Sequence, residues 1–154
     1  MPPAFQVRRL GPADLALMRS LNALFARAFD DPASYAAAPP QDDYLAQALA
    51  KQHVFALAAV DGREVAGGFE AYELEKLEQA RREVYIYDLA VDTTWRRRGV
   101  ATALIRRLQS LAVARGAHAV FVQADYGDDP AIALYEKLGV REEVLHYDLP
   151  PRAE

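Results

Sequence analysis

The chain has 154 residues, of which 52% are hydrophobic and 26% charged, so it is long enough to bury the core of one ordinary globular domain. It has no cysteine, which excludes disulfides, a thiolate nucleophile and a cysteine metal site, and its three histidines lack the spacing of metal ligands. The formal net charge of −4 argues against nucleic-acid binding and favours a cationic partner. Because it has neither a signal-peptide core nor an apolar run of about 18 residues, we expect a cytoplasmic protein without a membrane partner.

The first half of the chain mixes helical and strand patterns. Apolar spacing predicts a strand over 5–9, a helix over 14–29, a loop over 30–40, a helix over 42–51 and strands over 53–60 and 64–74. The helix over 14–29 carries its apolar residues on one stripe, which is typical of a helix packed on a sheet. The dipeptide Asp61-Gly62 predicts a hairpin turn between the two strands.

The second half predicts alternating strands and helices. After a charged connection over 75–82 we expect a strand over 83–91, a helix over 99–114, a strand over 119–124, a helix over 130–138 and an edge strand over 140–149. Gly116 and Gly139 end the two helices. Hairpins early in the chain and a β-α-β-α-β unit late indicate an α+β (mixed α/β) fold.

A basic, glycine-bearing turn joins the strand over 83–91 to the helix that follows. It reads Arg96-x-x-Gly99-x-Ala101, in which Gly99 lets the backbone approach a ligand and Ala101 leaves the helix start uncrowded. The free N–H groups and positive dipole end of a first helical turn bind phosphate oxygens, and neighbouring arginines add charge. The turn therefore predicts a phosphate or pyrophosphate site, with a solvated basic helix start as the alternative.

A second segment, 128–139, contains Pro130-Ala131 and the run from Leu134 to Gly139. Together with Leu89-Ala90-Val91 and the basic turn, it resembles the GNAT superfamily of N-acetyltransferases over about residues 5–149. The resemblance implies one acetyltransferase domain over 1–154. It also implies a central mixed, mostly antiparallel sheet with a splayed central strand pair and helices on both faces.

The same resemblance implies acetyl-CoA as acyl donor, with coenzyme A as product. It assigns the pantetheine and thioester to the backbone of Leu89, Ala90 and Val91, and the pyrophosphate to Arg96, Arg97, Arg98, Gly99, Val100, Ala101 and Thr102. Asp129 stands where the family often has Asn before Pro-Ala, and we expect it to cap the helix beside the cofactor.

Catalysis needs an acid for the leaving thiolate and a base for the amine. Tyr135 matches the tyrosine that often protonates the thiolate in the family, and a phenol of pKa about 10 suits a thiol of pKa about 8.5. An amine attacks only after losing a proton, so a carboxylate or water chain must lie near the thioester; Asp88, Glu83 and Asp125 are candidates. Strand alternation predicts that Asp88 faces away from Tyr87 and that Glu83 shares the face of Tyr87. Alternatively, Tyr135 is a core residue and Asp88 a structural partner of an arginine.

Between residues 123 and 148 seven acidic residues stand against two basic ones, which favours a polycationic acceptor, with a helix cap and a solvated edge as the alternative for single residues. The runs 85–91, 122–131 and 141–144 are similar to the aminoglycoside 3-N-acetyltransferases of the gentamicin-modifying type. That resemblance implies acetylation of the 3-amino group of the deoxystreptamine ring, by direct attack in a ternary complex. The candidate substrate-binding residues are Tyr87, Asp88, Asp125, Asp128, Glu142 and Glu143.

Two other functions fit the same residues. The first is an N-acetyltransferase for a polyamine, another amino sugar or a peptide amine. The second is a non-catalytic acyl-CoA sensor that keeps the cofactor cleft without turnover. We also expect a homodimer, because the predicted edge strand over 140–149 offers unpaired N–H and C=O groups to a second copy.

Overall fold

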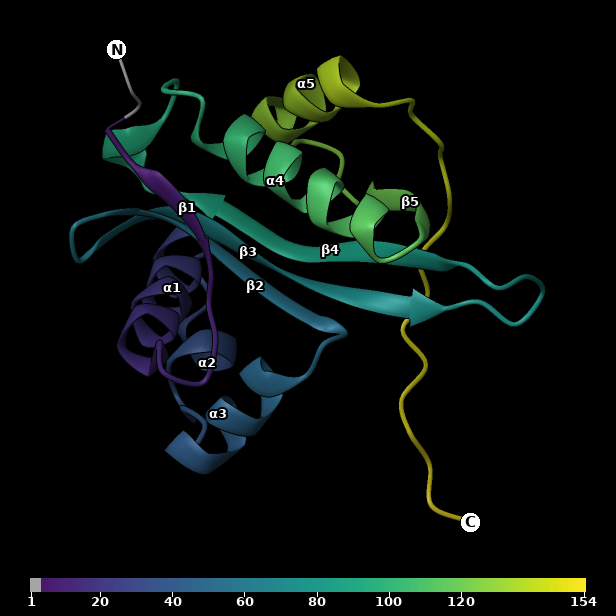
Figure 1. Ribbon diagram of the computed structural model, residues 1–154, viewed down its shortest axis with the longest axis horizontal. Helices are drawn as coiled ribbons and strands as arrows, with labels where there is room; N and C mark the ends of the chain where they lie inside the picture. Colours follow the sequence, from purple (N-terminus) through teal and green to yellow (C-terminus); the bar gives the residue numbers. More distant parts are fainter. Residues whose placement is uncertain (1–3) are drawn as a thin grey trace. The chain divides into compact units, whose positions relative to one another are not determined.

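Five strands form one sheet in the computed structural model of the chain, which describes residues 4–154 (Figure 1). Contacts divide the chain into two compact units, 1–123 and 124–154, and the sheet belongs to the first. In spatial order the strands are β1 (Gln6–Arg9), β2 (Val54–Asp61), β3 (Glu64–Glu75), β4 (Arg82–Val91) and β5 (Ala117–Val122). These five predicted strands are confirmed to within two residues at each end. The predicted domain bounds also take in residues 1–3, which lie outside the described residues.

The sheet is mixed and mostly antiparallel, as predicted. β1 to β4 pair antiparallel in succession, whereas β4 and β5 pair parallel. The β4–β5 register ends at Ile86 and Val122, but β4 continues along β3 as far as Val91. Within the described residues, β4 beyond Ile86 therefore pairs on one side only, which is the splay expected of the family fold.

Helices cover both faces of this sheet. α1 (Leu15–Ala28) and α3 (Asp42–Ala50) lie on one face and α4 (Val100–Ala114) on the other (Figure 1). Two adjacent glycines of β3 show how closely α1 and α4 approach the sheet. A Cβ at Gly68 would lie 2.7 Å from the side chain of Leu21 in α1, and one at Gly67 would lie 2.9 Å from Val100 in α4. Even-numbered residues of β3 next to Gly68 therefore face α1, and odd-numbered residues face α4.

The helices follow from their sequence patterns. The predicted stripe of α1 is confirmed, with Met18, Leu21, Leu24 and Phe25 buried. The prediction of a loop over 30–40 is wrong in part, because Pro32–Tyr35 forms a short helix, α2. Its first turn holds Pro32, and the Asp31 carboxylate accepts a hydrogen bond from the backbone N–H of Ser34 at 3.1 Å. One helical turn is too short to produce a periodic pattern. Among the described residues, no helix combines the length and apolar character needed to cross a membrane.

The second unit contains the helix α5 (Asp129–Leu138) and the chain that follows it. Its cap corrects one expectation: Asp128 caps the helix, accepting from the N–H of Ala131 at 3.4 Å, and Asp129 is already its first residue. The edge strand predicted over 140–149 is wrong as well, because this segment has no regular secondary structure. A strand is stable only beside another strand that satisfies its N–H and C=O groups, and this unit contains none.

Candidate functional site

Two carboxylates lie opposite each other on the face of the sheet that carries α1. Glu70 of β3 and Asp88 of β4 are register partners. The Tyr35 hydroxyl of α2 donates a hydrogen bond to Asp88 Oδ1 at 2.8 Å. Cross-strand partners have Cβ atoms about 4.5–5.5 Å apart, so one small cation can contact both carboxylates. Asp88 was predicted as a site residue, whereas Glu70 and Tyr35 were missed.

A β-bulge brings Asp88 to this face. Tyr85 pairs with Tyr72, but Asp88 pairs with Glu70, so three steps along β4 correspond to two along β3 and the register shifts. The extra residue is Tyr87, whose ring lies 5.7 Å from that of Tyr85 and 6.3 Å from that of Tyr72. The prediction that Asp88 and Tyr87 face opposite ways is therefore wrong, since a bulge interrupts strict alternation.

The environment raises the pKa of both carboxyl groups. Burial, with a further contribution from the Asp88 charge, raises the pKa of Glu70 to about 7, although Tyr72 acts in the opposite direction. The pKa of Asp88 is also raised, because the effect of burial exceeds the opposing effect of the hydrogen bond from Tyr35. Burial and Asp88 raise the pKa of the Tyr35 phenol well above its usual range. At neutral pH Glu70 is therefore able to gain or lose a proton beside Asp88.

Aromatic side chains continue from this acid pair along the same face. The rings of Tyr85 and Phe121 stack at 4.8 Å with an interplanar angle of 6°. The Tyr85 hydroxyl donates to Gln123 Oε1 at 2.8 Å. Tyr72 and Phe121 are each 37% exposed and Tyr87 is 61% exposed, so their rings are open to a ligand. Such surfaces bind sugar rings and, through their π faces, cations.

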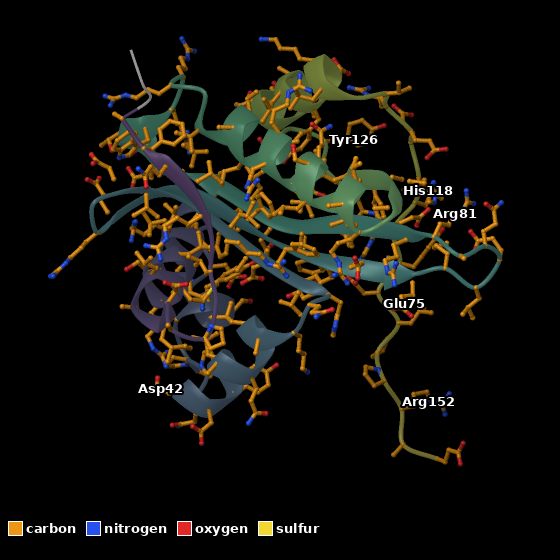
Figure 2. The ribbon with its side chains drawn as sticks, in the orientation of Figure 1. Asp42, Glu75, Arg81, His118, Tyr126 and Arg152 are labelled. Atoms are coloured by element: carbon orange, nitrogen blue, oxygen red, sulfur yellow. The ribbon has the colours of Figure 1, made fainter. Side chains whose placement is uncertain are left out.

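Glu83, the other base candidate on β4, lies in a different environment. Its carboxylate forms ion pairs with Lys76 Nζ at 3.6 Å and His118 Nε2 at 3.3 Å. Figure 2 shows His118 at the end of the sheet that also carries Glu75 and Arg81. Glu83 precedes Asp88 by five positions along β4, which is a distance of roughly 15 Å. The structure therefore does not bring Glu83 to the acid pair.

The basic turn has the backbone expected of an anion site. After the 3₁₀ turn Thr93–Trp95, Arg97 and Gly99 adopt positive φ of 61° and 78°. Gly99 is the N-cap of α4 and provides no side-chain cap, so the N–H groups of the first turn remain available. The three arginines are exposed, and the Arg98 guanidinium lies 5.1 Å above the Trp95 ring.

The predicted residues of the second unit cluster around α5 and the chain after it. Asp125, Asp128, Asp129, Glu142 and Glu143 are all exposed. Arg141 forms ion pairs with Glu136 at 2.5 Å and Glu143 at 3.4 Å. Burial, followed by the Asp128 charge, raises the pKa of Tyr135 to about 12, so this phenol keeps its proton at neutral pH.

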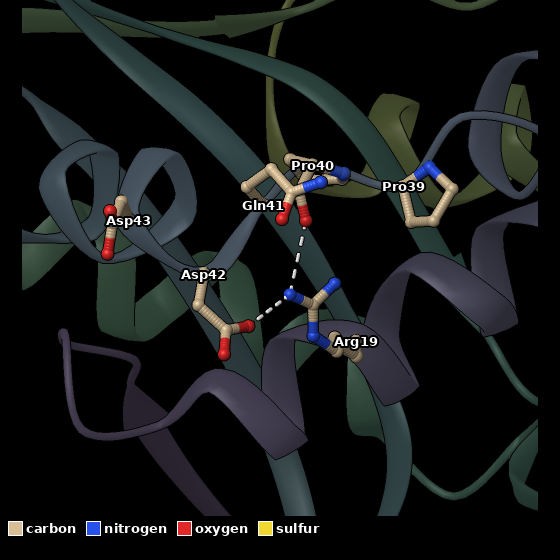
Figure 3. Close-up of a pocket in the computed structure, with 6 residues that line it drawn as sticks. All are labelled: Arg19, Pro39, Pro40, Gln41, Asp42 and Asp43. Carbon is tan, nitrogen blue, oxygen red and sulfur yellow. Dashed lines mark hydrogen bonds and ion pairs between the residues drawn. The ribbon is translucent and has the colours of Figure 1, made fainter.

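A pocket of about 380 Å³ lies elsewhere in the first unit (Figure 3). Its lining residues are Arg19, Pro39, Pro40, Gln41, Asp42 and Asp43. Arg19 donates a hydrogen bond to the Pro40 carbonyl at 3.1 Å and forms an ion pair with Asp42. These two contacts link α1 to the start of α3. None of the predicted site residues lines this pocket, and we assign it no catalytic role.

Comparison with known proteins agrees with the splayed sheet and the turn. The model of a family described as the acetyltransferase (GNAT) family matches residues 18–140. The chain belongs to this family. An aminoglycoside acetyltransferase from an uncultured soil metagenomic sample is 51% identical, with a TM-score of 0.93 over 96% of this chain and 99% of that one. No match was found among the curated proteins.

Two further solved structures extend the comparison. A second soil-metagenome aminoglycoside acetyltransferase, in complex with sisomicin, is 29% identical, with a TM-score of 0.88 over 96% of this chain and 97% of that one. A ribosomal-protein-alanine N-acetyltransferase from Brucella melitensis biovar Abortus 2308 is 23% identical, with a TM-score of 0.75 over 95% of this chain and 99% of that one. The last likeness concerns the fold alone. The chain is thus a GNAT acetyltransferase close to aminoglycoside acetyltransferases.

Proposed function

We propose that this protein transfers an acetyl group from acetyl-CoA to the 3-amino group of gentamicin-type aminoglycosides, by direct attack in a ternary complex. The observation that carries the proposal is the Glu70–Asp88 pair, located where β4 parts from β5 and beside an open aromatic surface. Carboxylates and aromatic rings together suit an aminated sugar. The 51% identical relative and the sisomicin complex of the second relative support the same class of acceptor.

The residues of the first unit fit the acyl donor. The uncapped first turn of α4 suits a pyrophosphate, and a Cβ placed on Gly99 would meet nothing within 4 Å, which leaves room for a ligand against the backbone. Leu89, Ala90 and Val91 follow the point at which β4 loses its partner β5, so their free backbone edge would hold the pantetheine arm. When bound, acetyl-CoA supplies an activated acyl group with a thiolate leaving group.

The acceptor is held and deprotonated by the chain's own side chains. In the first unit, Asp88 would bind the reacting ammonium and Tyr87 the sugar. In the second unit, the acidic residues that the family resemblance assigns to the acceptor are Asp125, Asp128, Glu142 and Glu143. Tyr135 would hydrogen-bond to or protonate the departing sulfur, and its raised pKa keeps the phenol in the protonated, donating form at neutral pH. Glu83 was the other candidate for the base on β4, but its ion pairs with Lys76 and His118 favour a structural role.

Thiol release from acetyl-CoA tests this function, with gentamicin, spermidine and a lysine peptide as parallel acceptors. Release with gentamicin and a product acetylated at the 3-amino group would support the proposal. Release only with spermidine or the peptide would replace the substrate and keep the chemistry. No release with any amine would favour the acyl-CoA sensor.

Two variants test the assigned roles. Tyr135→Phe should lower kcat with little change in acetyl-CoA affinity, and an unchanged kcat would remove it as the acid. Asp125→Asn should raise KM for gentamicin alone, and unchanged saturation would remove it from the acceptor site.

We further propose a homodimer and a cytoplasmic location, where acetyl-CoA is available. The segment 140–149 carries exposed apolar side chains, including Leu145 at 81% and Leu149 at 86%, that a second copy would bury. Sedimentation equilibrium of the full chain and of a variant with Leu145→Lys and Leu149→Lys would test this; equal masses would contradict dimerisation through the tail.

A further inference from the structure

We propose that Glu70 of β3 is the general base of acetyl transfer, while Asp88, oriented by Tyr35, is the anchor for the reacting ammonium. This inference rests on the proposed function and deepens it, because it divides the two tasks between two neighbouring carboxylates.

The first observation is the way the two acids are held. Asp88 has one oxygen fixed by the Tyr35 hydroxyl at 2.8 Å, so its second oxygen points in a restricted direction. Glu70, in contrast, forms no ion pair within residues 4–154, and its hydrogen-bonding neighbour is the Tyr72 hydroxyl of its own strand. A carboxylate oriented by a second element suits binding, whereas one that lacks a cationic partner can take up a proton.

The second observation is the absence of a protein cation. Over the described residues, neither Glu70 nor Asp88 lies within 4.0 Å of a Lys, Arg or His nitrogen. Three positions further along β3, on the opposite face, Glu73 is held by Arg115 at 2.5 and 2.8 Å. A partly buried carboxylate is stable only with a partner, and Glu73 has its partner within the chain. The geometry therefore assigns the missing cation of the Glu70–Asp88 pair to the acceptor ammonium.

The third observation concerns proton affinity. The ionisable neighbours of Glu70 are Asp88 of β4, Tyr72 of β3 and Tyr35 of α2. Beyond them, Asp31 lies near Tyr35, and Tyr44 of α3 and Tyr87 of β4 lie near Tyr72. None of these groups carries a positive charge, and burial, followed by the Asp88 charge, raises the pKa of Glu70 to about 7. Arriving as a cation, the acceptor favours the anionic form of Glu70, which then takes its proton.

A proton passes from the ammonium to the Glu70 carboxylate, and the nitrogen lone pair forms a bond to the acetyl carbonyl carbon. The C–S bond breaks, and its electron pair leaves with the sulfur. The nitrogen gives its second proton to solvent, which leaves a neutral amide, and the thiolate takes up one proton to become the free thiol. Glu70 then releases its proton to solvent and returns to its starting state.

The test compares three variants of the pair, Glu70→Gln, Glu70→Asp and Asp88→Asn, with a control on β3. The control is Glu75→Gln, because the Glu75 side chain is 76% exposed. Initial rates are measured against pH with gentamicin and acetyl-CoA. For the wild type, kcat/KM for gentamicin should rise tenfold per pH unit and level off above about pH 7. Glu70→Gln should lose about 10²–10⁴-fold in kcat. It should also lose this rise of kcat/KM with pH, which we call the pH limb, and should keep its gentamicin KM within threefold. Glu70→Asp should keep the pH limb at a reduced kcat.

Asp88→Asn should instead raise the gentamicin KM and leave the pH limb in place, and Glu75→Gln should match the wild type. A Glu70→Gln enzyme with wild-type kcat would overturn the assignment of the base. So would the reverse pattern, in which Asp88→Asn loses the pH limb and Glu70→Gln only raises KM. If the wild type itself turns over no amine, the proposed function fails, and the role of Glu70 fails with it.

Discussion

Glu70→Gln should make the protein more stable at alkaline pH while removing its activity. In the folded chain the pKa of Glu70 rises from 4.5 to about 7 because its side chain is largely buried beside Asp88. The folded state therefore holds a proton on this group over a pH range in which the unfolded chain has lost it. This contribution to stability is complete below about pH 4.5 and is lost as the pH rises through 7.

The size of the effect follows from that difference. At about 1.4 kcal/mol for each tenfold change in proton affinity, ionising Glu70 costs the folded state about 3 kcal/mol at pH 8.5 and less than about 1 kcal/mol at pH 5. A neutral glutamine avoids this cost at both values. The variant should therefore exceed the wild type by about 2–3 kcal/mol at pH 8.5 and by much less at pH 5.

Urea unfolding followed by far-ultraviolet circular dichroism measures this at the two pH values. Glu75→Gln, at a largely exposed position, should stay within about 0.5 kcal/mol of the wild type at both. The reasoning is refuted if the advantage of Glu70→Gln is the same at pH 5 and pH 8.5, or if the variant is less stable at pH 8.5. In either case Glu70 would not carry a raised pKa in the folded protein.

Three further substitutions test the frame of the site. Glu73→Gln leaves Arg115 without its buried carboxylate partner and should cost about 3 kcal/mol by urea unfolding at pH 7; a loss under about 1 kcal/mol would mean that solvent already screens the pair. Gly68→Ala places a Cβ 2.5 Å from the Leu57 carbonyl oxygen and should lower the unfolding free energy by about 2 kcal/mol or more. Unchanged thermal stability would show that α1 packs less closely on β3. Gly99→Ala meets no neighbour, so its expected loss of about 1 kcal/mol comes from the positive φ of 78° alone, and coenzyme A titration should show weaker binding if the turn holds the pyrophosphate.

The strands, the long helices and the basic turn were predictable because each depends on neighbouring residues. The Gly99 turn is an example: strand, glycine and amphipathic helix follow one another within about twenty residues. The missed residues depend on long-range pairing instead. Tyr35 and Asp88 are 53 residues apart, and nothing in the local sequence connects them. Glu70 gave one weak signal, as a carboxylate between the buried residues Phe69 and Ala71.

The two errors in the predicted faces and strands have physical causes. Alternation along β4 predicts the face of each side chain until a bulge inserts a residue, and no residue around Tyr87 is a glycine that would reveal one. The segment 140–149 has strand-like composition, but composition cannot provide the partner strand that its backbone needs. Both errors concern pairing between strands, which a single sequence does not encode locally.

The bulge at Tyr87 also connects the two halves of the proposed reaction. β4 pairs with β5 up to Ile86 and is free on that side from the next residue onward. The same extra residue turns Asp88 toward Glu70. In the proposed reaction, the free backbone edge proposed for the acyl donor and the carboxylate pair proposed for the acceptor therefore lie within two residues of each other along β4. A regular β4 could provide the free edge, but it would direct Asp88 toward α4 and leave Glu70 without its neighbour. If the proposed reaction takes place here, the position of the bulge, more than any single side chain, would bring amine and thioester together.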